Sequence, residues 1–408
     1  MSAPSPAPLL LRSARLTTGE TADVLVAEGR IAALGPDAAT HAAGLDPAPE
    51  EVDCAGLVLL PGLVDLHTHL RQPGKEDAET VETGTRAAAM GGFTSVHAMA
   101  NSTPTADTAG VVEQVWRLGR DAGWCDVHPV GAVTVGLAGE ALADLGAMAD
   151  SQARVRMFSD DGMCVHDAVL MRRALEYVKS FGGFVAQHAQ EPNLTAGAQM
   201  NESELSGVLG LAGWPAVAEE AVIARDVLLA QHVDSRLHVC HVSTAGSVEL
   251  IRWAKAQGVA VTAEVTPHHL LLTDELVRTF DPVYKVNPPL RTDDDVQALR
   301  RAVQNAQARL VRDVRRGPAG IGEHRGHRRP DVAQPSVEFE APQHHREFRP
   351  GVGPRRRPPC ASEVQVGGVD AGAAMPLRTH RHDLPPDARQ EQIGQGERPE
   401  EIGAHAEF

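Results

Sequence analysis

Apolar residues occur along this chain in two alternating patterns, short β-type runs and longer stretches with helical spacing. The β-type runs dominate residues 9–60, where they lie at Leu9–Leu16, Asp23–Ala27 and Arg30–Leu34. Glu28-Gly29, between the last two runs, predicts a hairpin turn. We therefore predict a small N-terminal β-domain over residues 1–60.

From about residue 61 the pattern becomes one of strands that alternate with helices. Helical spacing recurs at Val111, Val115 and Leu118, at Leu170, Ala174 and Val178, and at Ile223, Val227 and Ala230. Strand-like runs lie near Thr94–Ala98, Val127–Val130, Val155–Phe158, Phe184–Gln187, Leu237–Val242 and Val259–Val265. With the run before His67 they make seven β/α units, and eight units close a barrel. The predicted fold is α/β, a TIM-type (β/α)8 barrel over residues 61–305.

The eighth strand is expected near residues 307–316, where an apolar pair is flanked by arginines. Residues 301–408 contain 17 Arg, no Lys and 15 acidic residues, and they show no sustained periodicity. We predict a barrel that is incomplete at the eighth strand, followed over residues 306–408 by a poorly ordered Arg/Pro/Gly-rich tail. Translation of GC-rich DNA out of frame is the favoured origin of this tail, and a disordered tail is the alternative.

Potential metal ligands follow four of the strand-like runs. His67 and His69 are two residues apart, so a strand places both imidazoles on one face. Barrel strands open their carboxyl ends onto a single face. Imidazole and carboxylate suit zinc or a similar metal, although a His pair alone can also be surface or packing histidine. The convergence predicts a metal site from His67, His69, Asp161, His188 and His241.

Composition narrows the possible partners and compartment. The chain has 408 residues, 42% of them hydrophobic, and a formal net charge of −16. The charge argues against nucleic acid or an anionic membrane as partner. We find no membrane-length apolar run and no signal-peptide pattern. The scattered cysteines, Cys54, Cys125, Cys164, Cys240 and Cys360, indicate reduced thiols in the cytoplasm, with Cys164 and Cys240 as small buried hydrophobes.

Over residues 9–300 the chain resembles the bacterial class I dihydroorotases of the amidohydrolase superfamily. An ordered series of motifs carries the resemblance. It comprises Pro61-Gly62-Leu63-Val64-Asp65-Leu66-His67-Thr68-His69-Leu70-Arg71, Gly91-Gly92-Phe93-Thr94, Asn101-Ser102-Thr103-Pro104, Phe158-Ser159-Asp160-Asp161-Gly162, Val185-Ala186-Gln187-His188, His238-Val239-Cys240-His241-Val242-Ser243, Thr262-Ala263-Glu264-Val265-Thr266-Pro267-His268-His269 and Asn287-Pro288-Pro289-Leu290-Arg291.

The resemblance implies a dinuclear zinc centre. His67 and His69 would bind the first zinc, and His188 and His241 the second. Asp161 would bridge the two ions, with Asp160 as its supporting neighbour. Such a centre makes hydroxide available at neutral pH and polarises a carbonyl group. The implied reaction converts dihydroorotate and N-carbamoyl-aspartate into one another, in the direction of ring closure during pyrimidine synthesis.

Three further residues are candidates for binding the small-molecule substrate. Arg71 lies two residues after His69, so alternation along an extended chain would return it to the same face, where a guanidinium can bind a carboxylate. The resemblance places Asn101 and Asn287 beside it. A rim salt bridge for Arg71 and turn formation for the two asparagines are the alternatives.

The remaining histidines are interpreted as structural. His97, His128, His238 and His268 lie on or beside strands, and the pair His268-His269 is not expected to bind metal. His324 and His327 fall in the tail without a supporting strand.

The chain departs from the family at the end of the eighth strand. The family has an Ala-Thr-Asp-His-Ala-Pro-His-like motif there, whose Asp is the general acid and base, and the motif is missing here. The catalytic residue is therefore unassigned, and Asp313 is only a weak candidate. A missing proton carrier costs roughly 10²–10⁴ in rate. We predict a weakly active or inactive and poorly stable chain.

Other functions stay open at this point. Hydantoinases, dihydropyrimidinases and allantoinases share the motif of His67 and His69, but usually bridge their metals with a carboxylated lysine on the fourth strand. None of the four lysines, Lys75, Lys179, Lys255 and Lys285, lies on that strand. A non-catalytic scaffold for aspartate transcarbamoylase is the alternative from another class, and a homodimer is possible.

Overall fold

The computed structural model describes residues 7–315. Of the predicted tail, only residues 306–315 fall inside this range. Its proposed out-of-frame origin, Cys360 and the pair His324 and His327 lie outside the described residues.

The N-terminal residues form a four-stranded sheet. It contains β1 (Leu9–Arg15), β2 (Thr21–Ala27), β3 (Arg30–Leu34) and β4 (Glu50–Asp53) in the order β3-β2-β1-β4, with α1 (Pro36–Ala42) packed against it. Strands β1, β2 and β3 pair antiparallel, whereas β4 pairs parallel with β1. Glu28 and Gly29 connect β2 to β3 with φ of 51° and 72°, and this left-handed pair confirms the predicted hairpin turn.

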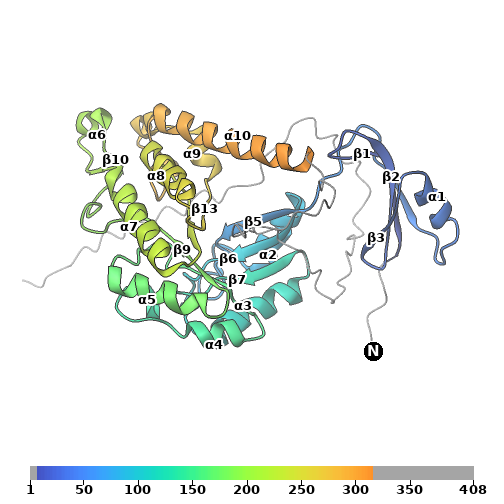
Figure 1. Ribbon diagram of the computed structural model, residues 1–408, viewed down its shortest axis with the longest axis horizontal. Coiled ribbons are helices and arrows are strands. Elements are labelled where there is room, and N and C mark those ends of the chain that lie inside the picture. Colours follow the sequence, from blue (N-terminus) through green and yellow to red (C-terminus); the bar gives the residue numbers. More distant parts are fainter. Residues whose placement is uncertain (1–6, 316–408) are drawn as a thin grey trace, which may run out of the picture. The chain divides into compact units, whose positions relative to one another are not determined.

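Seven parallel strands follow in the described residues. They are β5 (Leu63–Thr68), β6 (Phe93–Ala98), β7 (Asp126–Pro129), β8 (Met157–Phe158), β9 (Phe184–Gln187), β12 (Leu237–Val239) and β13 (Val261–Ala263). They form two sheets, β5-β6-β7 and β8-β9-β12-β13. A parallel bridge between Gly131 and Phe158 joins β7 to β8, so all seven are neighbours in sequence order (Figure 1). The seven strand-like runs are thus confirmed.

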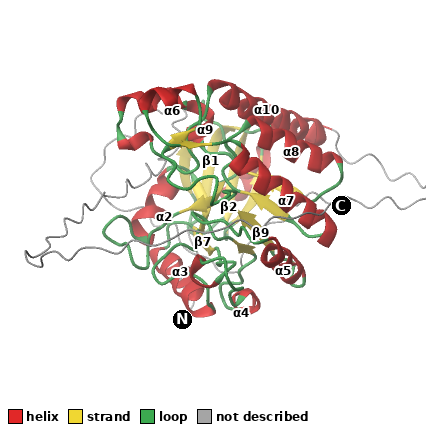
Figure 2. Ribbon diagram, turned by 90° about the vertical axis from the view of Figure 1, so that its left-hand side faces the viewer, coloured by secondary structure: helices red, strands yellow, loops and turns green. Residues whose placement is uncertain are grey.

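Helices follow most of these strands and pack outside them (Figure 2). They are α2 (Val81–Met90), α3 (Ala109–Ala122), α4 (Leu145–Asp150), α5 (Ala168–Lys179), α7 (Val217–Val233), α8 (Ala245–Ala256) and α9 (Pro267–Leu271). Helix α5 illustrates the cause: Met171, Ala174 and Val178 recur on one face and are fully buried. Smaller elements are β10 (Met200–Asn201), β11 (Gly213–Trp214), α6 (Glu204–Leu209) and the 3₁₀ helices Val135–Leu137, Asp274–Thr279 and Pro282–Tyr284.

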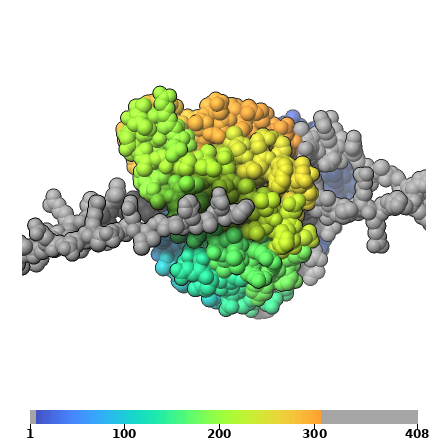
Figure 3. All heavy atoms as spheres, turned by 60° about the vertical axis from the view of Figure 1, so that its left-hand side comes forward, coloured from blue at the N-terminus to red at the C-terminus, as the bar shows by residue number. Residues whose placement is uncertain are grey.

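The last described element is a helix where the eighth strand was expected. Helix α10 (Asp293–Arg315) continues through residues 307–315 and packs against α8 and α9 (Figure 3). Val296 and Leu299 supply its buried face, and three acidic residues in its first turn favour a helix N-terminus. The predicted boundary between residues 305 and 306 falls inside this helix. No described helix, α10 included, is both long and apolar enough to cross a membrane.

Candidate metal centre

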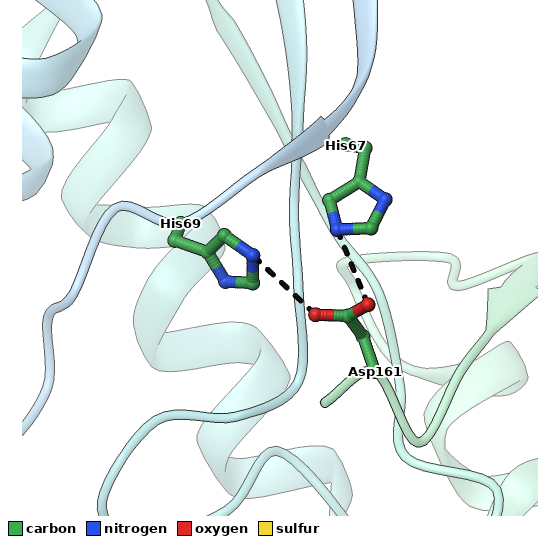
Figure 4. A group of neighbouring side chains, drawn as sticks. All are labelled: His67, His69 and Asp161. Atoms are coloured by element: carbon green, nitrogen blue, oxygen red, sulfur yellow. Dashed lines mark ion pairs between the residues drawn. The ribbon is translucent and has the colours of Figure 1, made fainter. Parts of the chain in front are cut away.

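Asp161 lies between His67, at the end of strand β5, and His69, which follows that strand. Its Oδ1 is 3.3 Å from Nε2 of His67, and its Oδ2 is 3.3 Å from Nε2 of His69 (Figure 4). The positions of these residues at strand ends explain the contact. His67 is the last residue but one of β5, and Asp161 lies three residues after β8. One carboxylate is thus approached on each oxygen by an imidazole.

Two more histidines reach the same carboxylate from β9 and β12. Nε2 of His241 is 3.3 Å from Oδ1 of Asp161, and Nδ1 of His188 is 3.5 Å from the same oxygen. The two imidazole nitrogens are themselves 2.8 Å apart. Asp161, His188 and His241 are all buried. The structure therefore brings together all five side chains that the sequence singled out as metal ligands.

In three of these imidazoles the remaining nitrogen is fixed by a hydrogen bond. His67 donates from Nδ1 to Glu264 at 2.6 Å, and His69 donates from Nδ1 to Oδ1 of Asn101 at 2.9 Å. His188 likewise donates from Nε2 to Gln190 at 2.8 Å. A neutral imidazole that donates from one nitrogen has a lone pair on the other.

The lone pairs of His67 and His69 face the carboxylate of Asp161, and Nδ1 of His188 lies 2.8 Å from Nε2 of His241 and 3.5 Å from the same carboxylate. This arrangement fits a bound cation. Lone pairs and carboxylate oxygens repel each other unless a metal ion or a proton lies between them. Three histidines oriented in this way around one buried carboxylate are the arrangement by which proteins fix metal-binding imidazoles. Two groups of side chains in the described residues share this carboxylate and are close enough to hold a metal: His67, His69 and Asp161, and Asp161, His188 and His241.

The electrostatics of the metal-free site show the same attraction for positive charge. Burial raises the pKa of Asp161, but the surrounding imidazoles, His67 first, outweigh it and hold that pKa well below its usual value. Burial lowers the pKa of His67, but Asp161, Cys240 and Glu264 raise it well above the ordinary value. Burial lowers the pKa of His69 and of His241. Without metal, His67 thus takes up a proton more readily than His69 or His241.

Glu264 and Gln190 are site residues that the sequence reasoning missed. Glu264 follows β13 directly, so its position at a strand end was the available signal. Burial opposes its ionisation, but His238 and His67 lower the pKa of its carboxyl group. Gln190 lies two residues beyond His188 and carries no such signal. Cys240 is fully buried, as expected, but it also forms with His67 and Glu264 a third group close enough to hold a metal.

The side chain of Asp160 forms hydrogen bonds to the segment after β7 rather than to the histidines. Its carboxylate accepts hydrogen bonds from the backbone N–H of Val133 at 2.7 Å and of Thr134 at 3.0 Å, and from the Thr134 hydroxyl. These bonds tie the segment after β8 to the segment after β7. Asp160 thereby fixes the backbone that carries Asp161.

The candidate substrate residues are placed differently from one another. His69, Arg71 and Asn101 line one small pocket beside the metal centre. Arg71 has φ of 59°, so the chain there is left-handed and the alternation expected from an extended strand does not apply. Asn101 orients His69, a contact that the sequence did not predict. Asn287 is exposed and is not among the residues that line this pocket.

The other histidines of the barrel region have structural surroundings. His97 and His128 stack with ring centroids 5.0 Å apart. His238 bonds from Nδ1 to the Thr262 hydroxyl at 2.8 Å. His269 uses both nitrogens in hydrogen bonds, one to the Thr266 hydroxyl at 2.8 Å and one to the carbonyl of Pro288 at 3.2 Å. Among the described residues, the groups close enough to hold a metal do not include His269, and that it binds no metal stays a prediction.

A buried polar network supports the segment that carries His241. Glu219 of α7 accepts hydrogen bonds from the backbone of Ser243 at 3.0 Å and of Thr244 at 3.3 Å, and from the hydroxyl of Ser247 at 2.7 Å. Arg291 donates from Nε to the hydroxyl of Ser243 at 3.1 Å and is itself fully buried. The segment that follows His241 is thus held from two sides.

Comparison with known proteins agrees with the geometry. A family model described as dihydro-orotase-like matches residues 56–247. The dihydroorotase of Streptomyces coelicolor is 67% identical over 302 residues, which cover 74% of this chain and 69% of that protein. The dihydroorotase of Leifsonia xyli is 66% identical over 74% of this chain and 68% of its own length. The dihydroorotase of Mycobacterium tuberculosis is 56% identical over 70% of this chain and 65% of its own length. The chain thus spans about two thirds of the length of these relatives.

Solved structures share the fold at much lower identity. The L-hydantoinase of Arthrobacter aurescens superposes with a TM-score of 0.59 at 23% identity, over 71% of this chain and 65% of that one. The dihydropyrimidinase of Brevibacillus agri superposes with a TM-score of 0.58 at 24% identity, over 73% of this chain and 66% of that one. These two show the α/β fold alone, whereas the sequence relatives are close enough to show the family. The chain belongs to the dihydroorotase family of cyclic amide hydrolases.

Proposed function

We propose that this chain binds two zinc ions and converts N-carbamoyl-L-aspartate and L-dihydroorotate into one another. In this proposal His67 and His69 bind one ion, His188 and His241 bind the other, and Asp161 contacts both. The observation that carries it is the approach of four imidazoles to the two oxygens of Asp161 at 3.3–3.5 Å.

The surrounding residues supply orientation and charge. Bound divalent ions lower the pKa of water and polarise the amide carbonyl, which makes ring opening and ring closure accessible at neutral pH. Glu264 and Asn101 hold two of the imidazoles in the tautomer that turns a lone pair toward the centre. Asp161 is buried and stays ionised, so it contributes a full negative charge between the proposed ions.

Substrate binding falls to the pocket beside His69. Arg71 lines this pocket, and a guanidinium can bind the carboxylate that both proposed substrates carry. The pocket lies next to the proposed ions because His69 belongs to both. Asn287 stays a predicted substrate contact that the described geometry does not place in the pocket.

We further propose that the seven parallel strands belong to a (β/α)8 barrel. Their sequence order, the outer helices and the likeness to hydantoinase folds support this architecture. Asp313 lies within α10 rather than at a strand end. The general acid and base therefore stays unassigned, and low activity stays our prediction.

The alternatives remain distinguishable by chemistry. All four lysines lie in the described range and outside its strands, so no lysine sits on β8 where a carboxylated bridge would be expected. A hydantoinase-like reaction is therefore less favoured. Homodimer formation and association with aspartate transcarbamoylase stay predictions.

The direct experiment is a turnover assay of the purified full chain in both directions, with zinc supplied. Asp161→Asn should abolish any turnover, while Asp150→Asn at the exposed end of α4 should leave it unchanged. Hydrolysis of hydantoin or dihydrouracil in place of dihydroorotate would contradict the proposed substrate. Tight zinc binding without turnover of any of these compounds would favour a non-catalytic role.

A further inference from the structure

Helix α7 carries two carboxylates that are almost completely buried, Glu219 and Asp226. They are about two helical turns apart, so they lie on one face of the helix. Acidic side chains are almost never fully buried unless they are paired. Glu219 is paired with the segment that follows His241, as described above. The partners of Asp226 show that the same helix also supports two other proposed ligands.

Asp226 holds the residue that immediately precedes His188. Oδ2 of Asp226 accepts a hydrogen bond of 2.8 Å from Nε2 of Gln187, which is the last residue of β9 and is itself fully buried. The backbone carbonyl of Gln187 in turn accepts a hydrogen bond of 3.0 Å from the N–H of Cys240, the residue before His241. Gln187 thus connects α7 to both of the strands that end in ligands of the second proposed ion.

The same group of residues holds the segment that follows Asp161. The side chain of Gln187 accepts from the backbone N–H of Val165 at 3.4 Å and donates to the carbonyl of Val165 at 3.2 Å. Arg225 donates to that carbonyl at 2.7 Å and pairs with Oδ1 of Asp226 at 2.6 Å. Burial raises the pKa of Asp226 to about 6, so its carboxylate is still ionised at neutral pH and makes charge-assisted hydrogen bonds.

The ligands of the first proposed ion have other supports. His67 is held by Glu264 and His69 by Asn101, and neither of these partners belongs to α7. The backbone at Asp161, which both ions share, is tied to the segment after β7 by the neighbouring aspartate. The imidazoles of the two proposed ions are therefore oriented by separate parts of the protein.

We propose that Asp226 is a positioning residue for the second ion alone, and that it acts through Gln187 on His188. Asp226 contacts no proposed ligand directly, so any effect on metal binding is transmitted by the amide side chain and the strand end that it holds. The inference rests on the proposed dinuclear centre. It adds that the occupancy of one ion can be changed without changing that of the other.

Variants that each lack one ion test this selectivity. His69→Ala should keep only the second ion, and His188→Ala only the first. Adding Asp226→Ala should raise the dissociation constant for zinc about tenfold in the His69→Ala chain, the lower end of the usual effect of losing support behind a metal ligand. In the His188→Ala chain it should change that constant by less than about twofold, as expected for sites without shared partners. Competition with a chromophoric chelator measures both constants.

A second variant separates positioning from a loss of stability. Asp226→Ala leaves the buried guanidinium of Arg225 without its partner, which can impair folding. Gln187→Met leaves that ion pair intact and removes only the amide that links it to β9. It should therefore reproduce the selective loss of the second ion. Gln231→Ala, at an exposed position of α7, is the matched control and should change neither constant.

The outcomes distinguish this inference from the proposed function. Equal weakening of both ions by Gln187→Met and Asp226→Ala, as a general loss of stability would cause, would overturn the inference and leave the dinuclear centre standing. Unchanged binding of the second ion in both variants would overturn it as well. A wild-type chain that binds no zinc would contradict the dinuclear centre itself, and the inference would fall with it.

Discussion

His67 donates a hydrogen bond of 2.6 Å from Nδ1 to the carboxylate of Glu264, which links the first and the last of the seven parallel strands at the candidate metal centre. The bond leaves Nε2 of His67 facing Asp161. It also accounts for the position of Glu264, a partly buried carboxylate that faces the imidazoles of His67 and His238. The tautomer of His67 and its place in the proposed metal ligation therefore depend on one contact.

Glu264→Gln should weaken zinc binding by about 10- to 100-fold, the usual effect of losing the partner of a metal-bound histidine. The neutral amide can still accept from His67, but it no longer raises the basicity of the imidazole. Competition with a chromophoric chelator measures the affinity. Glu249→Gln, at an exposed position of α8, is the matched control. Equal affinities in the two variants would show that Glu264 does not support a metal ligand.

Asn101→Ala separates the two roles considered for this asparagine. Because Oδ1 of Asn101 accepts from His69 at 2.9 Å, we expect the variant to lose roughly tenfold in zinc affinity. Asn193→Ala, in an exposed loop, controls for the loss of an amide. A raised KM with unchanged zinc affinity would instead identify Asn101 as a substrate contact.

Glu219→Ala should destabilise the chain by about 3 kcal/mol, because it removes the acceptor for several buried donors at once. The donors include the backbone N–H of Ser243 and the hydroxyl of Ser247. Urea denaturation of the metal-free chain measures the free energy of unfolding. The exposed replacement Glu249→Ala should change it by less than about 0.5 kcal/mol. A similarly small loss in Glu219→Ala would show that the network contributes little.

His269 should make the stability of the metal-free chain depend on pH. Burial, together with the charge of His241, lowers its pKa to about 3 from an ordinary value of 6.5. Because the folded pKa lies below the unfolded one, the stabilisation is complete above pH 6.5 and is lost as pH falls toward 3. The slope per group is about 1.4 kcal/mol per pH unit within this window.

Denaturation curves at several pH values test this dependence. His269→Gln should flatten the profile between pH 6.5 and 3, and it should start from a lower stability because His269 is buried and hydrogen-bonded through both nitrogens. His232→Gln, at the exposed end of α7, should retain the wild-type slope. An unchanged slope in His269→Gln would contradict a buried neutral imidazole.

The five proposed ligands could be identified from the sequence because each lies at or just beyond a strand end. The period of a strand places His67 and His69 together, and barrel topology brings in the other three. Glu264 also follows a strand, but its side chain is hydrogen-bonded to His67. This contact joins residues far apart in the sequence, so strand periodicity could not predict it. The expectation that alternation would place Arg71 on the same face as His69 does not apply either, because the backbone at Arg71 is left-handed.

The segment near residues 307–316, where barrel topology would put an eighth strand, was not expected to form one, and helix α10 occupies it through residue 315. The apolar positions of Val296 and Leu299 belong to a helical spacing that begins at residue 293, and the surrounding Ala, Gln and Arg residues favour a helix. The seven preceding strands were predictable because their β-type runs and the barrel topology agree.

Metal content of the purified chain tests the central claim most directly. After equilibrium dialysis against zinc and removal of loosely bound metal, elemental analysis should find two ions per chain. Asp161→Ala should lose both, whereas Asp150→Ala should keep both. A chain that retains no zinc, or an Asp161→Ala variant that retains two ions, would contradict the dinuclear centre.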